Sequence, residues 1–113
     1  MIENDQFNCL IYVVGPGKPR NVTVESTSSV SILVSWKEPF LPNGNISEYW
    51  IYFGQQKDDL NQTTVAGSER SWELTALSPF TTYYIKVRAK TKELGTASAL
   101  LNATTLEDSK FFT

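Results

Sequence analysis

Apolar and polar residues alternate in short runs through the middle of the chain. The clearest runs carry apolar side chains at every second position, namely Val30, Ile32, Val34 and Trp36, then Tyr49, Ile51 and Phe53, then Tyr83, Ile85, Val87 and Ala89. Successive side chains of a β-strand point to opposite faces of the sheet, so a period of two predicts strands with one buried face. We therefore expect a half-buried strand at each of these three places.

Four weaker runs complete the pattern between Pro19 and Leu106. They contain Val22 and Val24, residues 63–66, Trp72 and Leu74, and residues 99–105. Residues 58–61 and 92–97 have the composition of loops. About seven short strands without a helical period predict an all-β sandwich over residues 19–106. Residues 1–18 are expected to form an N-terminal flank or linker, and residues 107–113 a C-terminal linker.

Composition excludes several classes of function. The 113 residues include no His and a single cysteine, Cys9, so the usual Ser-His and Cys-His nucleophiles, a zinc cluster and an intrachain disulfide are ruled out. We therefore expect neither an enzyme nor a bound cofactor or metal. A formal net charge of −2 argues against a nucleic-acid-binding protein, which usually carries a basic excess. No apolar run reaches the 18 residues that a membrane span requires.

Three motifs sharpen the fold prediction. They are Val34-Ser35-Trp36-Lys37-Glu38-Pro39, then Pro42-Asn43-Gly44-Asn45-Ile46 leading into Tyr49-Trp50-Ile51-Tyr52-Phe53, and Leu77-Ser78-Pro79-Phe80-Thr81-Thr82-Tyr83. In this order and spacing they resemble the fibronectin type III family, and the third resembles the tyrosine corner of that family at Leu77, Pro79 and Tyr83. The resemblance covers residues 19 to about 105. An immunoglobulin domain is disfavoured because it would require two cysteines to bridge its sheets.

The resemblance implies a seven-stranded immunoglobulin-like sandwich of fibronectin type III topology. The first, second and fifth strands would form one sheet, and the other four strands would form the second sheet. The ring of Tyr83 would be buried, with its hydroxyl bonded to an upstream backbone group. The implied core comprises Trp36, Tyr49, Ile51, Trp72, Leu74, Tyr83, Ile85 and Val87.

Four Asn-x-Ser/Thr sequons are candidates for N-glycosylation, at Asn21, Asn45, Asn61 and Asn102. A chain with this Asn, Ser and Thr content would contain about one or two by chance, so four indicate an extracellular glycoprotein. Asn45 and Asn61 are expected in loops, and Asn102 on an outward strand face. Cys9 leaves two alternatives open. It either pairs with a cysteine beyond this chain or is a free thiol of an intracellular protein.

Two series of side chains at every second position predict a candidate binding face. Lys86, Arg88 and Lys90 recur at every second residue, and Trp50 and Tyr52 do the same in the strand that the family pairs with theirs. Cations beside exposed aromatic rings permit cation–π stacking. The face is either a solvated surface that stabilises itself, a site for a protein partner, or a site for a sulfated glycosaminoglycan or an acidic membrane surface.

These observations predict a non-enzymatic spacer and protein-interaction module. The resemblance suits the extracellular regions of receptor tyrosine phosphatases, Eph-type receptors and neural adhesion molecules, so we expect a cell-surface, single-pass membrane protein or a secreted one. Partners would be another protein or neighbouring domains of the same chain. Any kinase or phosphatase activity would belong to another part of the parent chain. The alternatives are an intracellular scaffold module of the muscle-filament type and an accessory domain of a secreted carbohydrate-active enzyme.

Overall fold

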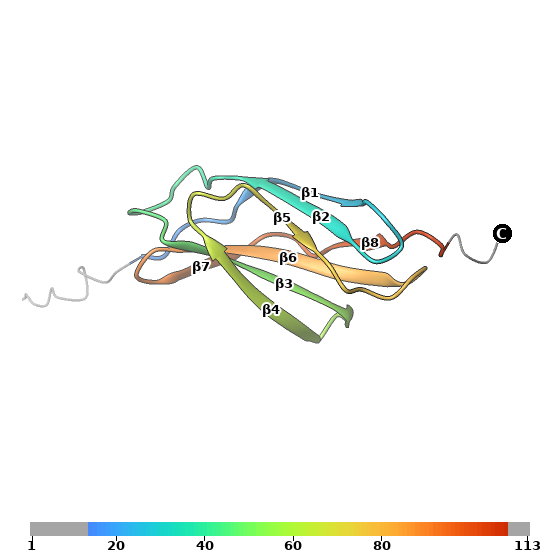
Figure 1. Ribbon diagram of the computed structural model, residues 1–113. Coiled ribbons are helices and arrows are strands. Elements are labelled where there is room, and N and C mark those ends of the chain that lie inside the picture. Colours follow the sequence, from blue (N-terminus) through green and yellow to red (C-terminus); the bar gives the residue numbers. More distant parts are fainter. Residues whose placement is uncertain (1–13, 109–113) are drawn as a thin grey trace, which may run out of the picture.

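The computed structural model describes residues 14–108 and folds them into eight β-strands (Figure 1). These are β1 (Arg20–Ser26), β2 (Ile32–Lys37), β3 (Glu48–Gln56), β4 (Asp59–Ala66), β5 (Ser71–Leu74), β6 (Thr82–Lys90), β7 (Leu94–Ala97) and β8 (Leu101–Thr104). The described residues include no helix long and apolar enough to cross a membrane. The predictions for Cys9 concern a residue outside the described range.

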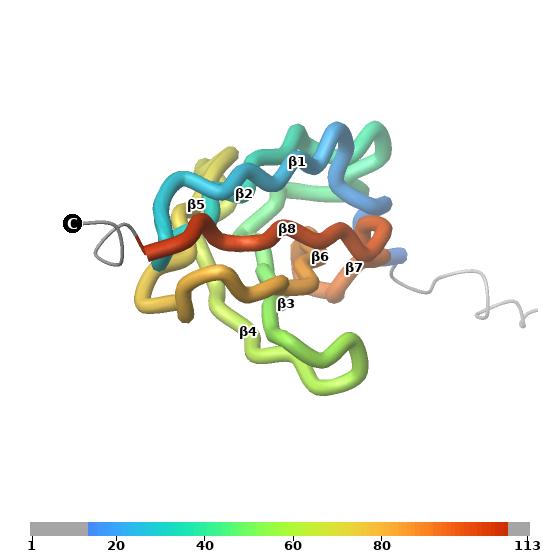
Figure 2. Tube along the Cα trace, turned by 90° about the vertical axis from the view of Figure 1, so that its right-hand side faces the viewer, coloured from blue at the N-terminus to red at the C-terminus, as the bar shows by residue number. Residues whose placement is uncertain are grey.

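Two antiparallel sheets form the sandwich. One sheet has the order β1-β2-β5, and the other has the order β4-β3-β6-β7, with β8 also paired to β6. Figure 2 shows the two layers, with β8 running between β1 and β6. The predicted all-β sandwich is thus confirmed, including the division of the strands between the two sheets. The described chain enters at one end of the sandwich and leaves at the opposite end (Figure 1).

The last strand is divided, which makes eight strands rather than seven. β7 pairs with the end of β6 through Arg88 and Lys90, and β8 pairs with its beginning, from Thr82 to Ile85. Ser98 joins the two pieces, because its Oγ accepts a hydrogen bond from Val87 N at 3.0 Å. The expectation of a loop over residues 92–97 was wrong for Leu94–Ala97. The long strand β6 provides backbone hydrogen-bonding partners for these residues, and the local composition does not reveal such partners.

The hairpin of β3 and β4 differs from its prediction as well. Gln56 pairs with Asp59, so the turn contains only Lys57 and Asp58, and β4 begins at Asp59. The expectation of a loop over residues 58–61 was therefore wrong from Asp59 onward. β4 is an edge strand, and such a strand tolerates charged and polar residues because one of its sides faces solvent.

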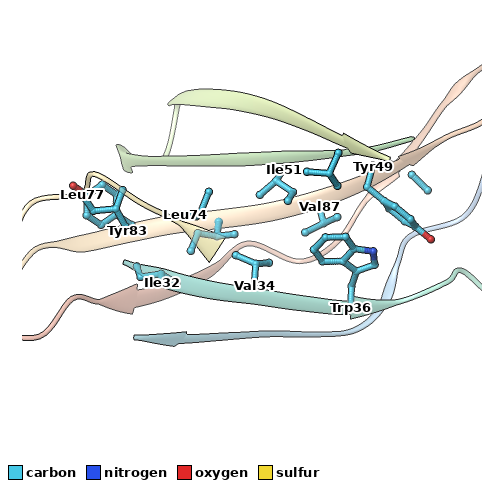
Figure 3. Close-up of a cluster of buried hydrophobic side chains, with 12 residues drawn as sticks. Ile32, Val34, Trp36, Tyr49, Ile51, Leu74, Leu77, Tyr83 and Val87 are labelled. Atoms are coloured by element: carbon cyan, nitrogen blue, oxygen red, sulfur yellow. The ribbon is translucent and has the colours of Figure 1, made fainter. Parts of the chain in front are cut away.

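The core lies between the sheets. The fully buried apolar side chains, each 0% exposed, are Ile32, Val34, Tyr49, Ile51, Ile85, Val87 and Ala89. Trp36 of β2 packs against Tyr49 of β3 with ring centroids 5.2 Å apart, as Figure 3 shows. Trp36, Leu74, Leu77 and Tyr83 are buried as well. Side chains from both sheets thus meet in one continuous cluster.

Trp72 corrects the predicted core. Its register places it opposite Val34 and so on the inner side of the sheet, yet 42% of its surface is exposed. β5 is a short edge strand, so no neighbouring strand covers the outer flank of the ring. Alternation gives the face on which a side chain lies, but it does not give the distance of that side chain from the sheet edge.

The crossing from β5 to β6 is held by the Tyr83 hydroxyl. This hydroxyl accepts a hydrogen bond from Ser78 N at 2.9 Å, and Tyr83 is 6% exposed. Thr105, itself buried, donates from Oγ1 to Ser78 O at 2.6 Å and accepts from Thr81 N at 2.9 Å. Ser78 is therefore bonded through both its backbone N–H and its carbonyl, which fixes the path of the chain between the sheets.

The Tyr83→Phe variant is expected to lose about 1 kcal/mol or more of unfolding free energy, because it removes this one hydrogen bond and keeps the ring. Tyr84→Phe is the matched control, since Tyr84 points to the opposite side of the same strand. Urea denaturation of both variants measures the difference. Equal midpoints for Tyr83→Phe and Tyr84→Phe would show that the hydroxyl of Tyr83 contributes nothing to stability.

Candidate interaction face

The outer side of the larger sheet collects cationic and aromatic side chains along its two central strands. Glu48, Trp50 and Tyr52 of β3 stand directly opposite Lys90, Arg88 and Lys86 of β6. Ile51 and Val87 lie between them in sequence and are 0% exposed on the inner side, so the six residues point outward. We call these six residues the basic–aromatic face. All six are half-buried, because neighbouring side chains on the sheet cover part of each.

Several of these side chains are held by contacts within the face. The indole Nε1 of Trp50 donates to Oε2 of Glu48 at 2.6 Å. Nζ of Lys86 lies 5.4 Å from the ring centroid of Tyr52, within cation–π distance. The rings of Trp50 and Tyr52 are neighbours, with centroids 6.4 Å apart and planes tilted by 51°. The aromatic pair thus has a defined orientation.

Arg88 is fixed by a residue that the sequence did not point to. Its guanidinium Nε donates to the carbonyl oxygen of Gly95 in β7 at 2.8 Å.

A second cation–π pair was also not predicted from the sequence. Nζ of Lys57 in the β3–β4 turn lies 5.2 Å from the ring centroid of Tyr84. The alternation of β6 places Tyr84 on the outer side, but nothing local in the sequence indicates where the turn carries Lys57.

The flanking strands add no charge to the face. Thr64 and Gln62 of β4 lie opposite Trp50 and Tyr52, and Gln62 Nε2 donates to Thr64 Oγ1 at 2.6 Å. On the other flank, Ala97 and Leu94 of β7 lie opposite Arg88 and Lys90. The face therefore combines three cations, one carboxylate and two aromatic rings between neutral margins, which is an arrangement suited to binding rather than to covalent chemistry.

Comparison with known proteins agrees with this architecture. The family model for the fibronectin type III domain matches residues 17–104. The chain belongs to this family. A fibronectin type III domain is a non-catalytic module, and the described residues contain no group of three acidic, Cys or His side chains that could hold a metal ion.

Relatives of this fibronectin type III domain include parts of much longer proteins. Rat usherin is 41% identical over 73 residues, which cover 58% of this chain and 1% of usherin. Chicken ephrin type-A receptor 7 is 34% identical over 95 residues, which cover 82% of this chain and 10% of the receptor. The crystal structure of the FN5 domain of Drosophila Lar superposes with a TM-score of 0.69 at 33% identity, covering 82% of this chain and 99% of that one. The chain thus spans a small part of the two longer relatives.

The four sequon asparagines are all exposed, but they lie in different surroundings. Asn45 lies in the loop between β2 and β3, and Asn102 lies in β8 opposite Tyr84, at the end of the basic–aromatic face. Asn21 lies in an irregular part of β1. Asn61 was expected in a loop and lies instead in β4, opposite Phe53, so that expectation was wrong.

Among the described residues, Tyr49 is a titratable group whose pKa is clearly shifted by its surroundings. Burial raises the pKa of Tyr49, while the Arg70 guanidinium, 5.5 Å from its ring centroid, acts in the opposite direction. The Tyr49 hydroxyl and Nε1 of Trp36 are buried, and neither has a hydrogen-bond partner. Tyr49 is 0% exposed and packed in the core, so it serves the fold rather than the face.

Proposed function

We propose that this fibronectin type III domain is an extracellular, non-enzymatic spacer and protein-interaction module of a cell-surface receptor or adhesion protein. Its basic–aromatic face would bind a protein partner that offers acidic side chains. The observation that carries the proposal is the pairing of half-buried Trp50 and Tyr52 with Lys86, Arg88 and Lys90 on two central strands.

The chemistry of the face favours a protein partner. Trp, Tyr and Arg are the residue types enriched at the energetic centres of protein interfaces. Trp50 and Arg88 are each held by a hydrogen bond, which reduces the ordering cost that binding would otherwise incur. The three cations outnumber the single carboxylate of Glu48, so an acidic partner would be attracted to this face.

Three further observations support the spacer role and the extracellular placement. The described chain runs from one end of the sandwich to the other, so domains joined to its two ends would be held apart by its length (Figure 1). The relatives include an ephrin receptor and a putative receptor-type tyrosine phosphatase of Culex quinquefasciatus, 33% identical over 84 residues. Exposure of all four sequon asparagines is compatible with glycans at every sequon.

Immobilised poly-glutamate provides a defined acidic polypeptide for testing the face. We expect the wild-type domain to be retained at low salt and released as salt rises, because screening weakens the attraction. The combined change Lys86→Ser, Arg88→Ser and Lys90→Ser should abolish retention. The matched control is Lys18→Ser, Lys37→Ser and Arg70→Ser, which removes the same charge from exposed positions elsewhere. Equal losses in the two variants would mean that net charge, and not this face, governs binding.

A parallel heparin column separates the protein partner from the sulfated glycosaminoglycan alternative. Retention on heparin that depends on Lys86, Arg88 and Lys90, together with no retention on poly-glutamate, would favour the glycosaminoglycan. The absence of retention on both columns would leave the stacked side chains as a self-stabilised surface and would refute the proposed binding role. The melting temperature of each variant is measured alongside, so that a loss of binding can be distinguished from a loss of folding.

A further inference from the structure

An apolar groove lies at the end of the sandwich where the described chain begins. Its volume is about 510 Å³, within the range of roughly 300–1,000 Å³ typical of small-molecule sites. Its walls come from the start of β1, the β2–β3 loop and the junction of β7 and β8, and include Val22, Phe40, Leu41, Ala99 and Leu101. Phe40 is 80% exposed and Leu41 is 68% exposed, so large apolar side chains here stand open to solvent.

One of the four sequons lies in the wall of this groove. Arg20 pairs with Lys37 and Thr23 pairs with Ser35, so Asn21 and Val22 together stand opposite the single residue Trp36. This bulge places Asn21 at a φ of 49°, a left-handed conformation that Asn tolerates better than most residues. Asn21 is exposed, and it is one of the residues that line the groove, beside Arg20 and Val22. The other three sequon asparagines are not among the residues that line it.

We propose that Asn21 carries an N-linked glycan whose first N-acetylglucosamine units lie in this groove against Phe40 and Leu41. The inference rests on the proposed extracellular placement. In the attachment step, Nδ2 of Asn21 bonds to C1 of the first sugar of a lipid-pyrophosphate-linked oligosaccharide. The bond between C1 and the pyrophosphate oxygen breaks, the lipid pyrophosphate leaves with the electron pair, and Nδ2 loses one proton. The reaction is carried out by the oligosaccharide transferase of the secretory pathway.

The chemistry of the groove matches that of a sugar ring. A pyranose has a face of weakly positive C–H groups, which packs on the negative face of an aromatic ring, and it has a rim of hydroxyls. The Arg20 guanidinium lies 4.1 Å from the ring centroid of Phe40 and so covers one of its faces, while the high exposure of Phe40 leaves contact area for a sugar. Lys18 and Arg20 provide polar groups at the groove walls for the hydroxyls.

The test begins with glycopeptide mapping of the chain secreted from mammalian cells. Thr23→Val removes the sequon at Asn21 and keeps a β-branched residue at an exposed position of β1. Thr63→Val is the control, because it removes the sequon at Asn61 by the same substitution, at a half-buried position of β4. We expect Asn21 to be occupied, and we expect Thr23→Val to lower the melting temperature by roughly 4–8 °C, a shift expected for a modest stability change in a domain of this size. Thr63→Val should lower it by less.

A second variant isolates contact with the groove. Phe40→Ser should lower the melting temperature of the glycosylated domain by more than that of the Thr23→Val background, where only the contact of the ring with Arg20 is lost. Trimming every glycan to a single N-acetylglucosamine should retain most of the stabilisation, whereas an amidase that removes this last sugar should abolish it. The same effect of Phe40→Ser in both backgrounds would overturn the packing of the glycan in the groove.

The outcomes also separate this inference from the proposed function. Glycans at other sequons with Asn21 unoccupied would overturn the inference and leave the extracellular placement intact. The absence of glycan at all four sequons would overturn both. Occupancy of Asn21 with a stability that depends on both Thr23 and Phe40 would support both.

Discussion

Trp36→Ala is expected to lower the free energy of unfolding by about 3–5 kcal/mol. Trp36 is 3% exposed, and its ring packs against Tyr49, so the change opens a cavity between the two sheets (Figure 3). The loss arises mainly from this packing, because the ring lies inside the core cluster. Because the free energy of unfolding of a small domain is only about 5–15 kcal/mol, this single change would remove a large part of it. Urea denaturation followed by circular dichroism measures the effect.

Trp72→Ala is the matched control for this prediction. It deletes the same side chain from β5, next to β2, at a position that is 42% exposed. We expect a loss of no more than about 1 kcal/mol, because a half-exposed ring leaves a smaller cavity and loses less buried area. Equal losses for Trp36→Ala and Trp72→Ala would contradict the arrangement of the core described here.

Gly95→Ala is expected to destabilise the domain by about 1–3 kcal/mol, through crowding rather than through a cavity. A Cβ on Gly95 would collide with the carbonyl oxygen of Pro16 and would lie 2.7 Å from Pro16 Cγ. Pro16 is fully buried, and its carbonyl accepts a hydrogen bond from Thr96 N at 3.1 Å, so the backbone cannot withdraw without losing that bond. The variant should therefore release the segment before β1 from β7.

Hydrogen exchange at the Thr96 amide, together with the melting temperature, measures this release. Gly17→Ala is the control, since the nearest atom to a Cβ there is Leu41 O at 3.6 Å, an ordinary contact distance. We expect fast exchange at Thr96 in Gly95→Ala and slow exchange in Gly17→Ala. Slow exchange in both variants would mean that the segment before β1 does not depend on the close approach at Gly95.

The sequence predicted best where alternation was strict and the strand had a neighbour on each side. β2, β3 and β6 have a clear period of two, and their inward positions, such as Ile51 and Val87, are 0% exposed. The prediction failed where neighbours in space decide the structure. Trp72 has the spacing of a core residue but lies at a sheet edge, and Leu94–Ala97 forms a strand because β6 offers it a partner.

The candidate face could be predicted only in part for the same reason. Two alternations, with the strand pairing that the family implies, bring Trp50 and Tyr52 beside Lys86 and Arg88. The carbonyl of Gly95 that holds Arg88, and the position of Lys57 over Tyr84, depend on turns whose paths no local pattern specifies. The apolar groove likewise combines three segments that are distant in sequence, so Asn21 could not be assigned to its wall beforehand.

Extracellular placement of this module can be checked by the intact mass of the chain secreted from mammalian cells, before and after enzymatic removal of N-glycans. We expect a fall of one or more glycan masses on treatment, with conversion of asparagine to aspartate at Asn21 and at other occupied sequons among Asn45, Asn61 and Asn102. An unchanged mass would contradict the extracellular placement and would favour an intracellular scaffold module.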